Sequence, residues 1–311
     1  VIADGMSTDH TRDEIQRFAD AHPELKIEIV DNLKRNIPSG LNRAIQASNG
    51  ETIVRLDAHS MPNPEYVARS VANLEQNLGD NVGGVWEIQP GGKGWIARSI
   101  AVAASHPLGV GDALYRYTNR AGEVDTVPFG AFKRSLVVRV GYFDENLLTN
   151  EDYDFNTRVR QVGGKIWLDP AIRSKYFARP DLASLARQYW RYGYWKEKML
   201  KKFPGAIRWR QALPPAFVAA ILLLALLSIW LPLAQWLLLS GLSLYFIILL
   251  LIAVTVAGYF WNMKRQSRRQ IAPPAAHITK NEKLKKTILY SVWNWVAHIR
   301  ERKHTRTFDI T

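Results

Sequence analysis

Two absences narrow the possibilities for this chain of 311 residues. It has no cysteine, which excludes a disulfide framework and agrees with a folded part in the cytosol. It also has no Asp, Glu, Lys or Arg from position 211 to position 263. Helices of soluble proteins keep a polar face, so this run argues against a pair of buried helices in a large soluble core. As one helix it would measure roughly 80 Å, against a bilayer core about 30 Å thick.

The uncharged run is long enough to cross a membrane twice. Its natural breaks are Pro232 and the pair Ser240-Gly241. We therefore predict one spanning helix over 212–231 and a second over 242–261, joined by a short uncharged turn.

The basic residues surround this predicted membrane hairpin. The net charge of +13 belongs to a linker at 196–211 and a tail at 262–311, whereas residues 1–195 are close to neutral. Loops rich in Lys and Arg stay cytoplasmic, so both flanks face the cytosol if the chain goes out and returns. Nucleic-acid binding is the other explanation of such a charge, but these residues border the lipid segment rather than a folded surface.

The basic tail also contains a predicted amphipathic helix at the membrane surface. Three basic residues, Lys285, Lys286 and Arg300, leave too few apolar positions for a third span. The apolar residues that recur there at helical spacing are Leu284, Ile288, Leu289, Val292, Val296 and Ile299.

The first half of the chain alternates short apolar strands with helices. We predict strands that end at Ala3 and cover 26–30, 52–56 and 82–88, with helices over 9–21, 38–47 and 64–78. This alternation predicts an α/β fold with a mostly parallel sheet flanked by helices. The chain begins within a strand and without an initiator Met, so we expect that N-terminal residues are missing.

Two of these strands end in acidic residues. Asp4 begins the segment Asp-Gly-Met-Ser-Thr-Asp, and Asp57 follows the strand over 52–56. Ligands of such sheets bind beyond the carboxyl ends of the strands, where both carboxylates are expected. Ordinary turn and helix-cap chemistry is the alternative explanation of the Ser-Thr-Asp group.

The second half of the soluble part is less regular. Five glycines at 83, 84, 91, 92 and 94 suggest a mobile loop. Glu151 and Asp152 open a predicted helix that stops at Gly163-Gly164. Acidic residues in a first helical turn are also favoured by the helix dipole alone, so their position has two explanations.

Taken in order, these segments resemble glycosyltransferase family 2. The resemblance covers residues 1 to about 195 well and the membrane segment loosely. The form Asp-Ala-His and the hairpin look most like bacterial exopolysaccharide transferases of the succinoglycan glucosyltransferase type. The segments that carry the resemblance lie at 4–9 (DGMSTD), 55–59 (RLDAH), 130–132 (GAF), 141–145 (GYFDE) and 150–152 (NED).

The resemblance implies a GT-A fold over 1–195 and an inverting mechanism. A divalent metal, Mg²⁺ or Mn²⁺, would be held by Asp57 and His59 and would neutralise the leaving diphosphate. His59 stands where a second Asp is commoner; imidazole can ligate Mn²⁺, or His59 only hydrogen-bonds a neighbour. The residues implied in binding the nucleotide sugar are Asp4, Ser7, Asp9, Asn42 and Asp57.

The resemblance also implies a general base, Asp152, next to Glu151. An ordinary Asp is a weak base, so we expect burial and the adjacent carboxylate to raise its pKa. A clamp on acceptor or diphosphate is implied for Gly130, Gln188 and Arg191. Gln188 and Arg191 match a Gln-x-x-Arg-Trp element, with Tyr192 where Trp is usual. An amphipathic helix at the membrane surface is a compatible alternative for that element.

The implied reaction transfers glucose from its uridine diphosphate to a polyprenyl-linked saccharide. It would occur at the cytosolic face of the bacterial inner membrane, where anchoring raises the effective concentration of a lipid-linked acceptor. A processive polysaccharide synthase and a non-catalytic scaffold of an assembly complex are the alternatives. In this family the first strand supplies much of the nucleotide pocket, so the chain as given would lack part of the donor site.

Overall fold

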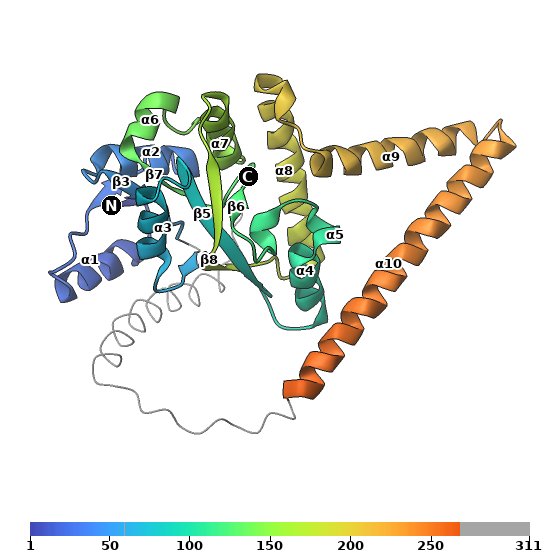
Figure 1. Cartoon of the computed structure of the whole chain (residues 1–311), viewed down its shortest axis with the longest axis horizontal. Coiled ribbons are helices and arrows are strands. Elements are labelled where there is room, and N and C mark those ends of the chain that lie inside the picture. Colours follow the sequence, from blue (N-terminus) through green and yellow to red (C-terminus); the bar gives the residue numbers. More distant parts are fainter. Residues whose placement is uncertain (59, 268–311) are drawn as a thin grey trace. The chain divides into compact units, whose positions relative to one another are not determined.

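The computed structural model describes residues 1–58 and 60–267 (Figure 1). His59 and the predicted helix over 284–299 lie outside the described residues. The described chain forms two compact units, one over Val1–Ala206 and one that begins at Ile207.

The first unit contains two sheets. The smaller one pairs β1 (Ile2–Asp4) with β2 (Ile29–Asp31) in parallel. The larger one has the order β3-β7-β5-β8-β4, with β6 also beside β8. Its strands are β3 (Thr52–Val54), β4 (Met61–Pro62), β5 (Asn81–Gln89), β6 (Gly122–Glu123), β7 (Ala131–Lys133) and β8 (Ile166–Phe177).

The α/β class is confirmed, but the larger sheet is mixed rather than mostly parallel. Only β5 and β8, side by side in Figure 1, pair in parallel within it. The β3–β7, β5–β7, β4–β8 and β6–β8 pairs are antiparallel. The strand–helix alternation that predicted a parallel sheet lies in residues 1–88. β7 follows β5 after a long segment without such a repeat, and it inserts between β3 and β5. The direction of β7 could therefore not be predicted from the sequence pattern.

Helices pack around these sheets, and their starts follow local capping chemistry. The Asn36 side chain accepts a hydrogen bond from the Ser39 amide at the start of α2, and Asp181 does the same for Ser184 in α8. The helices of this unit are α1 (Thr11–Ala21), α2 (Ile37–Ala47), α3 (Tyr66–Glu75), α4 (Trp95–Ser105), α5 (Pro107–Val110), α6 (Arg134–Val140), α7 (Glu151–Gln161) and α8 (Leu182–Lys202), with the 3-10 turns η1 (Leu114–Arg116) and η2 (Pro204–Ala206).

The sequence predicts a mobile loop at the glycines of positions 83 and 84, but both lie inside β5. A Cβ added to Gly84 would lie 1.8 Å from the Ile172 carbonyl oxygen, and one added to Gly83 would lie 2.6 Å from the Val127 Cβ. Close approach of the β8 backbone at Gly84 and of the Val127 side chain at Gly83, rather than mobility, requires glycine at these positions.

The main core holds α7 against the larger sheet. The ring of Phe155 in α7 stacks on Phe143 at 4.7 Å and meets Phe132 of β7 at 5.1 Å. All three side chains are buried in one cluster with Ile166 and Leu168 of β8. Burying such aromatic side chains contributes roughly 1.5–3 kcal/mol each, so the start of α7 has a well-defined position on the sheet.

Up to residue 267, where the described part of the chain ends, the second unit contains two apolar helices, α9 (Trp209–Leu227) and α10 (Pro232–Ser267). Segments Trp209–Leu227 and Pro232–Gly258 are long and apolar enough to cross a membrane. The predicted second span began ten residues too late, because only Pro232 breaks the run. Proline suits the first position of a helix, whereas Gly241 lies within α10, where neighbouring apolar residues continue the helix.

Candidate active site

A buried arginine joins the end of β3 to the start of α7. Arg55 is 7% exposed. Its Nε and Nη2 lie 2.9 and 3.1 Å from the two Asp57 carboxylate oxygens, and Nη2 also lies 3.0 Å from Glu151 Oε1. Two segments almost a hundred residues apart therefore share one guanidinium, which sequence reasoning had not assigned to the site.

The charges in this cluster shift one another's proton affinities. Burial and the neighbouring Asp152 raise the pKa of Glu151 to about 7, although Arg55 acts in the opposite direction. Burial also raises the pKa of Asp152, with Arg55 again opposing and Asp57 adding to the rise. The direction predicted for Asp152 is therefore the one that the structure has, with Asp57 as a contributing carboxylate.

The start of α7 presents its two carboxylates differently. Glu151 is buried against Arg55, whereas Asp152 is partly exposed and its Oδ1 accepts a hydrogen bond from the Tyr153 amide at 2.7 Å. Asn150 before them has a left-handed backbone, with φ of 68°. The helix dipole favours both acids, but it does not account for the ion pair between Glu151 and Arg55. Asp152 thus has the larger exposed fraction as a residue, although its carboxylate is buried enough to have a raised pKa.

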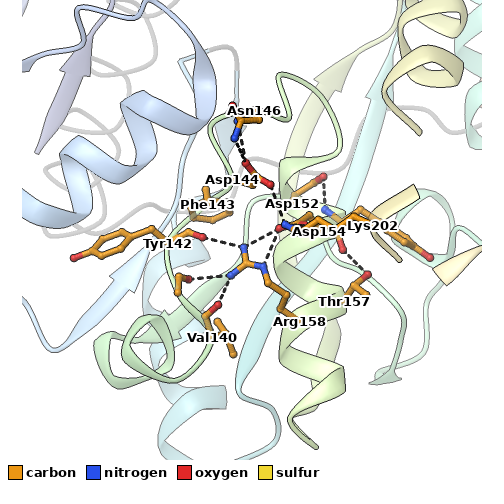
Figure 2. Close-up of polar contacts among 12 residues, drawn as sticks. Val140, Tyr142, Phe143, Asp144, Asn146, Asp152, Asp154, Thr157, Arg158 and Lys202 are labelled. Atoms are coloured by element: carbon orange, nitrogen blue, oxygen red, sulfur yellow. Dashed lines mark hydrogen bonds and ion pairs between the residues drawn. The ribbon is translucent and has the colours of Figure 1, made fainter. Parts of the chain in front are cut away.

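Behind these acids, α7 is attached to the end of α8 through Asp154 (Figure 2). The Asp154 side chain is 0% exposed and accepts hydrogen bonds from Arg158 Nε at 2.9 Å and Lys202 Nζ at 3.0 Å. Lys202 also binds Asp144 at 2.9 Å. Arg158 donates further to the carbonyl oxygens of 140–142.

Tyr153 makes a second attachment to the same region. Its hydroxyl lies 3.2 Å from the Ala206 carbonyl oxygen and 3.1 Å from Asp125 Oδ2. The Lys196 ammonium lies 3.6 Å from the centre of its ring, a cation–π contact. The buried Met199 packs in the same cluster. Residues 196–202, predicted as a linker, thus form the last turns of α8 and fix α7.

Asp4 stands in a separate ion-pair cluster beside β1 and β2. Its carboxylate accepts hydrogen bonds from the Ser7 amide at 3.0 Å, the Ser7 hydroxyl at 2.6 Å and Arg12 Nε at 2.7 Å. Arg12 also binds Asp31 at 2.6 Å. Burial opposes ionisation of Asp4, but the bonds from Ser7 and Arg12 lower its pKa. Asp9 accepts from the amide and hydroxyl of Thr11 and thereby starts α1.

The remaining predicted site residues have structural partners. Asn42 holds the turn after α6, because its side chain exchanges two 2.9 Å hydrogen bonds with the Phe143 backbone. Gly130 has φ of 90°, and an added Cβ would lie 2.5 Å from Asn81 Oδ1. Its carbonyl accepts from the Arg55 amide at 3.0 Å, so it borders the cluster.

The two predicted clamp residues on α8 are one turn apart and have different partners. Gln188 donates to the hydroxyls of Tyr176 at 3.1 Å and Tyr192 at 2.7 Å. Arg191 reaches Thr149, just before the start of α7, at 3.4 Å. Of the predicted residues, the structure therefore brings together Asp57, Glu151 and Asp152, with Gly130 beside them.

Comparison with known proteins decides the family. The sequence profile of Glycosyl transferase family 2 matches residues 1–141. The succinoglycan biosynthesis protein ExoA of Rhizobium meliloti is 32% identical over 232 residues, which cover 74% of this chain and 68% of that protein. The chain belongs to glycosyl transferase family 2. It is therefore a glycosyltransferase.

Two further proteins resemble this family 2 glycosyltransferase. A dolichyl N-acetyl-alpha-D-glucosaminyl phosphate 3-beta-D-2,3-diacetamido-2,3-dideoxy-beta-D-glucuronosyltransferase of Methanococcus voltae is 26% identical, over 67% of this chain and 66% of that protein. The mannosyltransferase PcManGT from Pyrobaculum calidifontis, solved with GDP-Man and Mn²⁺, has a TM-score of 0.55 and 23% identity, over 78% of this chain and 69% of that one. The chain spans about two thirds of the length of its relatives.

A divalent metal fits the chemistry of Asp57. In the part of the chain that the structure describes, no group of three or more His, Cys, Asp or Glu side chains is arranged to hold an ion. Metal sites on diphosphate substrates need only one or two protein carboxylates, since phosphate and water oxygens complete the coordination. Asp57, whose two carboxylate oxygens accept hydrogen bonds from Arg55, is the carboxylate that would take part in such a site.

Proposed function

We propose that this family 2 glycosyltransferase inverts the anomeric carbon of a hexose, glucose from its uridine diphosphate, while transferring it to a polyprenyl-linked saccharide. The observation that supports this proposal is the buried Arg55 cluster. It holds Asp57, a candidate for the donor diphosphate and its metal, close to the Glu151-Asp152 pair at the start of α7.

In the proposed reaction Asp152 is the general base. Its carboxylate takes the proton of the acceptor hydroxyl while that oxygen forms a bond to the anomeric carbon. The bond from this carbon to the diphosphate oxygen breaks, and the nucleoside diphosphate leaves with the electron pair. Attack from the face opposite the leaving group inverts the configuration. The raised pKa of Asp152 makes it a stronger base than an ordinary Asp.

The donor would be bound by two groups of side chains. Asp4 and Ser7, with Asp9, would hold the base or ribose, while Asn42 would support the donor site through the turn at Phe143. Asp57, with His59, would hold Mg²⁺ or Mn²⁺. When bound, such an ion neutralises the charge that develops on the leaving diphosphate.

The acceptor side of the proposal depends on the membrane. The two candidate spans would place the first unit at the cytosolic face of the bacterial inner membrane, and Gly130, Gln188 and Arg191 would contact acceptor or diphosphate. The names of the two curated relatives, a succinoglycan biosynthesis protein and a dolichyl-linked sugar transferase, support a saccharide acceptor on a polyprenyl lipid.

A donor screen with a matched pair of variants tests this proposal. The protein in lipid nanodiscs is given nucleotide sugars, Mn²⁺ and a polyprenyl-phosphate saccharide, and release of nucleoside diphosphate is followed. We expect UDP-glucose to be used and Asp152→Asn to lose about 10²–10⁴-fold in kcat. Asp20→Asn, on the exposed face of α1, is the control. Equal turnover by the Asp152→Asn and Asp20→Asn variants would refute the mechanism.

The length of the product separates this proposal from the two alternatives. A single added hexose per acceptor supports the proposed transferase. A ladder of long products would instead identify a processive synthase. No turnover with any donor, together with binding of another protein of the assembly pathway, would identify a scaffold.

A further inference from the structure

Helix α8 carries apolar side chains both where it packs on the protein and where it is exposed. One side faces the protein: Leu185 packs against the cluster of Ile100, Ala101 and Ala178, and Met199 is completely buried. A helix on the surface of a soluble domain is expected to present polar residues on the opposite side.

The outward side of α8 instead presents large apolar and aromatic residues. Trp190 is 80% exposed, and Leu182, Tyr189 and Tyr194 also have more than half of their surface exposed. We call these four residues the aromatic face.

Basic residues border the aromatic face. Arg187, Arg191 and Lys198 are exposed along its edge, and the Lys198 ammonium lies 4.7 Å from the centre of the Tyr194 ring. The only acidic residue of α8, Glu197, is paired with Lys201 at 2.6 Å. Trp and Tyr beside Lys and Arg are the side chains that settle at the headgroup level of a membrane.

The position of α8 along the chain also favours a lipid surface. The helix ends at Lys202 and the first candidate span begins at Trp209. The chain between them extends at most about 25 Å, so α8 stays close to any bilayer that α9 enters. Each nearby basic residue adds about 1 kcal/mol of attraction to an anionic leaflet.

We propose that the aromatic face of α8 docks on the headgroup region of an anionic bilayer, as a contact additional to the two candidate spans. This proposal depends on membrane association and not on the sugar chemistry. Elsewhere on α8, Lys196, Lys202 and the following turn hold Tyr153 and Asp154 of α7. One helix therefore contacts lipid outside and the helix of the general base inside.

The absence of cysteine makes a site-specific test direct. Trp190→Cys and Val138→Cys are each labelled with the environment-sensitive fluorophore NBD in the whole protein, in nanodiscs of phosphatidylcholine with phosphatidylglycerol. Val138 in α6 is 84% exposed and serves as the control. We expect blue-shifted NBD emission at 190, quenched several-fold more strongly by doxyl-labelled lipid than the emission at 138. Equal quenching at both positions would overturn the proposal.

Two further measurements identify the occupant. In the Trp190→Cys background, the change of Arg187 and Lys198 to Gln should weaken quenching in anionic nanodiscs and leave it unchanged in pure phosphatidylcholine. Bis-maleimide crosslinking between two chains of the Trp190→Cys variant, with no quenching by lipid, would show a second copy on this face and overturn the proposal. Because no sugar donor is present, a failed transferase assay leaves these results unaffected.

Discussion

Replacing Lys202 by methionine removes one cation from the buried carboxylate of Asp154. In the native protein Lys202 lies 3.0 Å from Asp154 and 2.9 Å from Asp144. Methionine keeps most of the aliphatic length of lysine but cannot donate a hydrogen bond. Asp154 then depends on Arg158 alone, and Asp144 loses its link to α8.

The expected magnitude lies between two limits. Removing one partner of a fully buried ion pair costs about 3–5 kcal/mol, whereas an exposed pair is worth about 0–1 kcal/mol. Lys202 is 43% exposed, Asp154 is 0% exposed and Arg158 remains as a partner. We therefore expect a loss of about 1–2 kcal/mol, or about 2–8 °C in Tm for a unit of this size.

The assay compares Lys202→Met with Lys201→Met in nanodiscs. Lys201 pairs only with the exposed Glu197 one turn away, so its loss should change Tm by less than about 2 °C. For Lys202→Met we also expect kcat to fall about tenfold or more with the donor KM nearly unchanged, because small misplacements of a catalytic group are costly. Equal Tm and kcat in the two variants would show that Lys202 does not position α7.

Three further predictions concern the cluster around Arg55 and the sheet. In the folded protein the pKa of Glu151 is raised to about 7. Glu151 therefore contributes its full stabilisation below about pH 4.5 and loses it as the pH rises to about 7. The free energy of unfolding in urea should depend less on pH across that window for Glu151→Gln than for the native protein. Arg55→Met should cost about 3–5 kcal/mol, and adding Glu151→Gln should recover part of it in a double-mutant cycle; simple additivity would show that the two side chains are not coupled. Gly84→Ala should lower stability by about 1–3 kcal/mol or more, since its Cβ meets the Ile172 carbonyl, while Gly122→Ala, which has open space, should change Tm little; similar Tm values would contradict the close approach of β5 and β8.

The structural features that could be predicted from the sequence are those that depend on a local pattern of residues. The first helices follow apolar periodicity and were placed within a few residues. Asp57 and Asp152 stand in recognisable segments, and the structure connects both to Arg55. Arg55 belongs to one of these segments, but nothing in the pattern RLDAH predicts that its side chain turns inward.

The features that the sequence did not predict depend on contacts between distant segments. The bond between Lys202 and Asp154 joins residues far apart in the chain, and the density of Lys and Arg before the apolar run pointed only to a membrane flank. Likewise, nothing in the residues around Gly84 predicts that β8 passes close to it. A helix break is predicted at Gly241 because glycine often marks one. In the structure, however, the long apolar helix α10 continues through this residue.

The bond between the Tyr153 hydroxyl and the Ala206 carbonyl has a practical consequence for anyone who wants the enzymatic part without its lipid anchor. A chain cut at 195 would discard Lys202, Met199 and Ala206, and helix α7, which bears Glu151 and Asp152, would lose its supports. A cut placed just after Ala206 keeps all three residues and still removes both candidate spans.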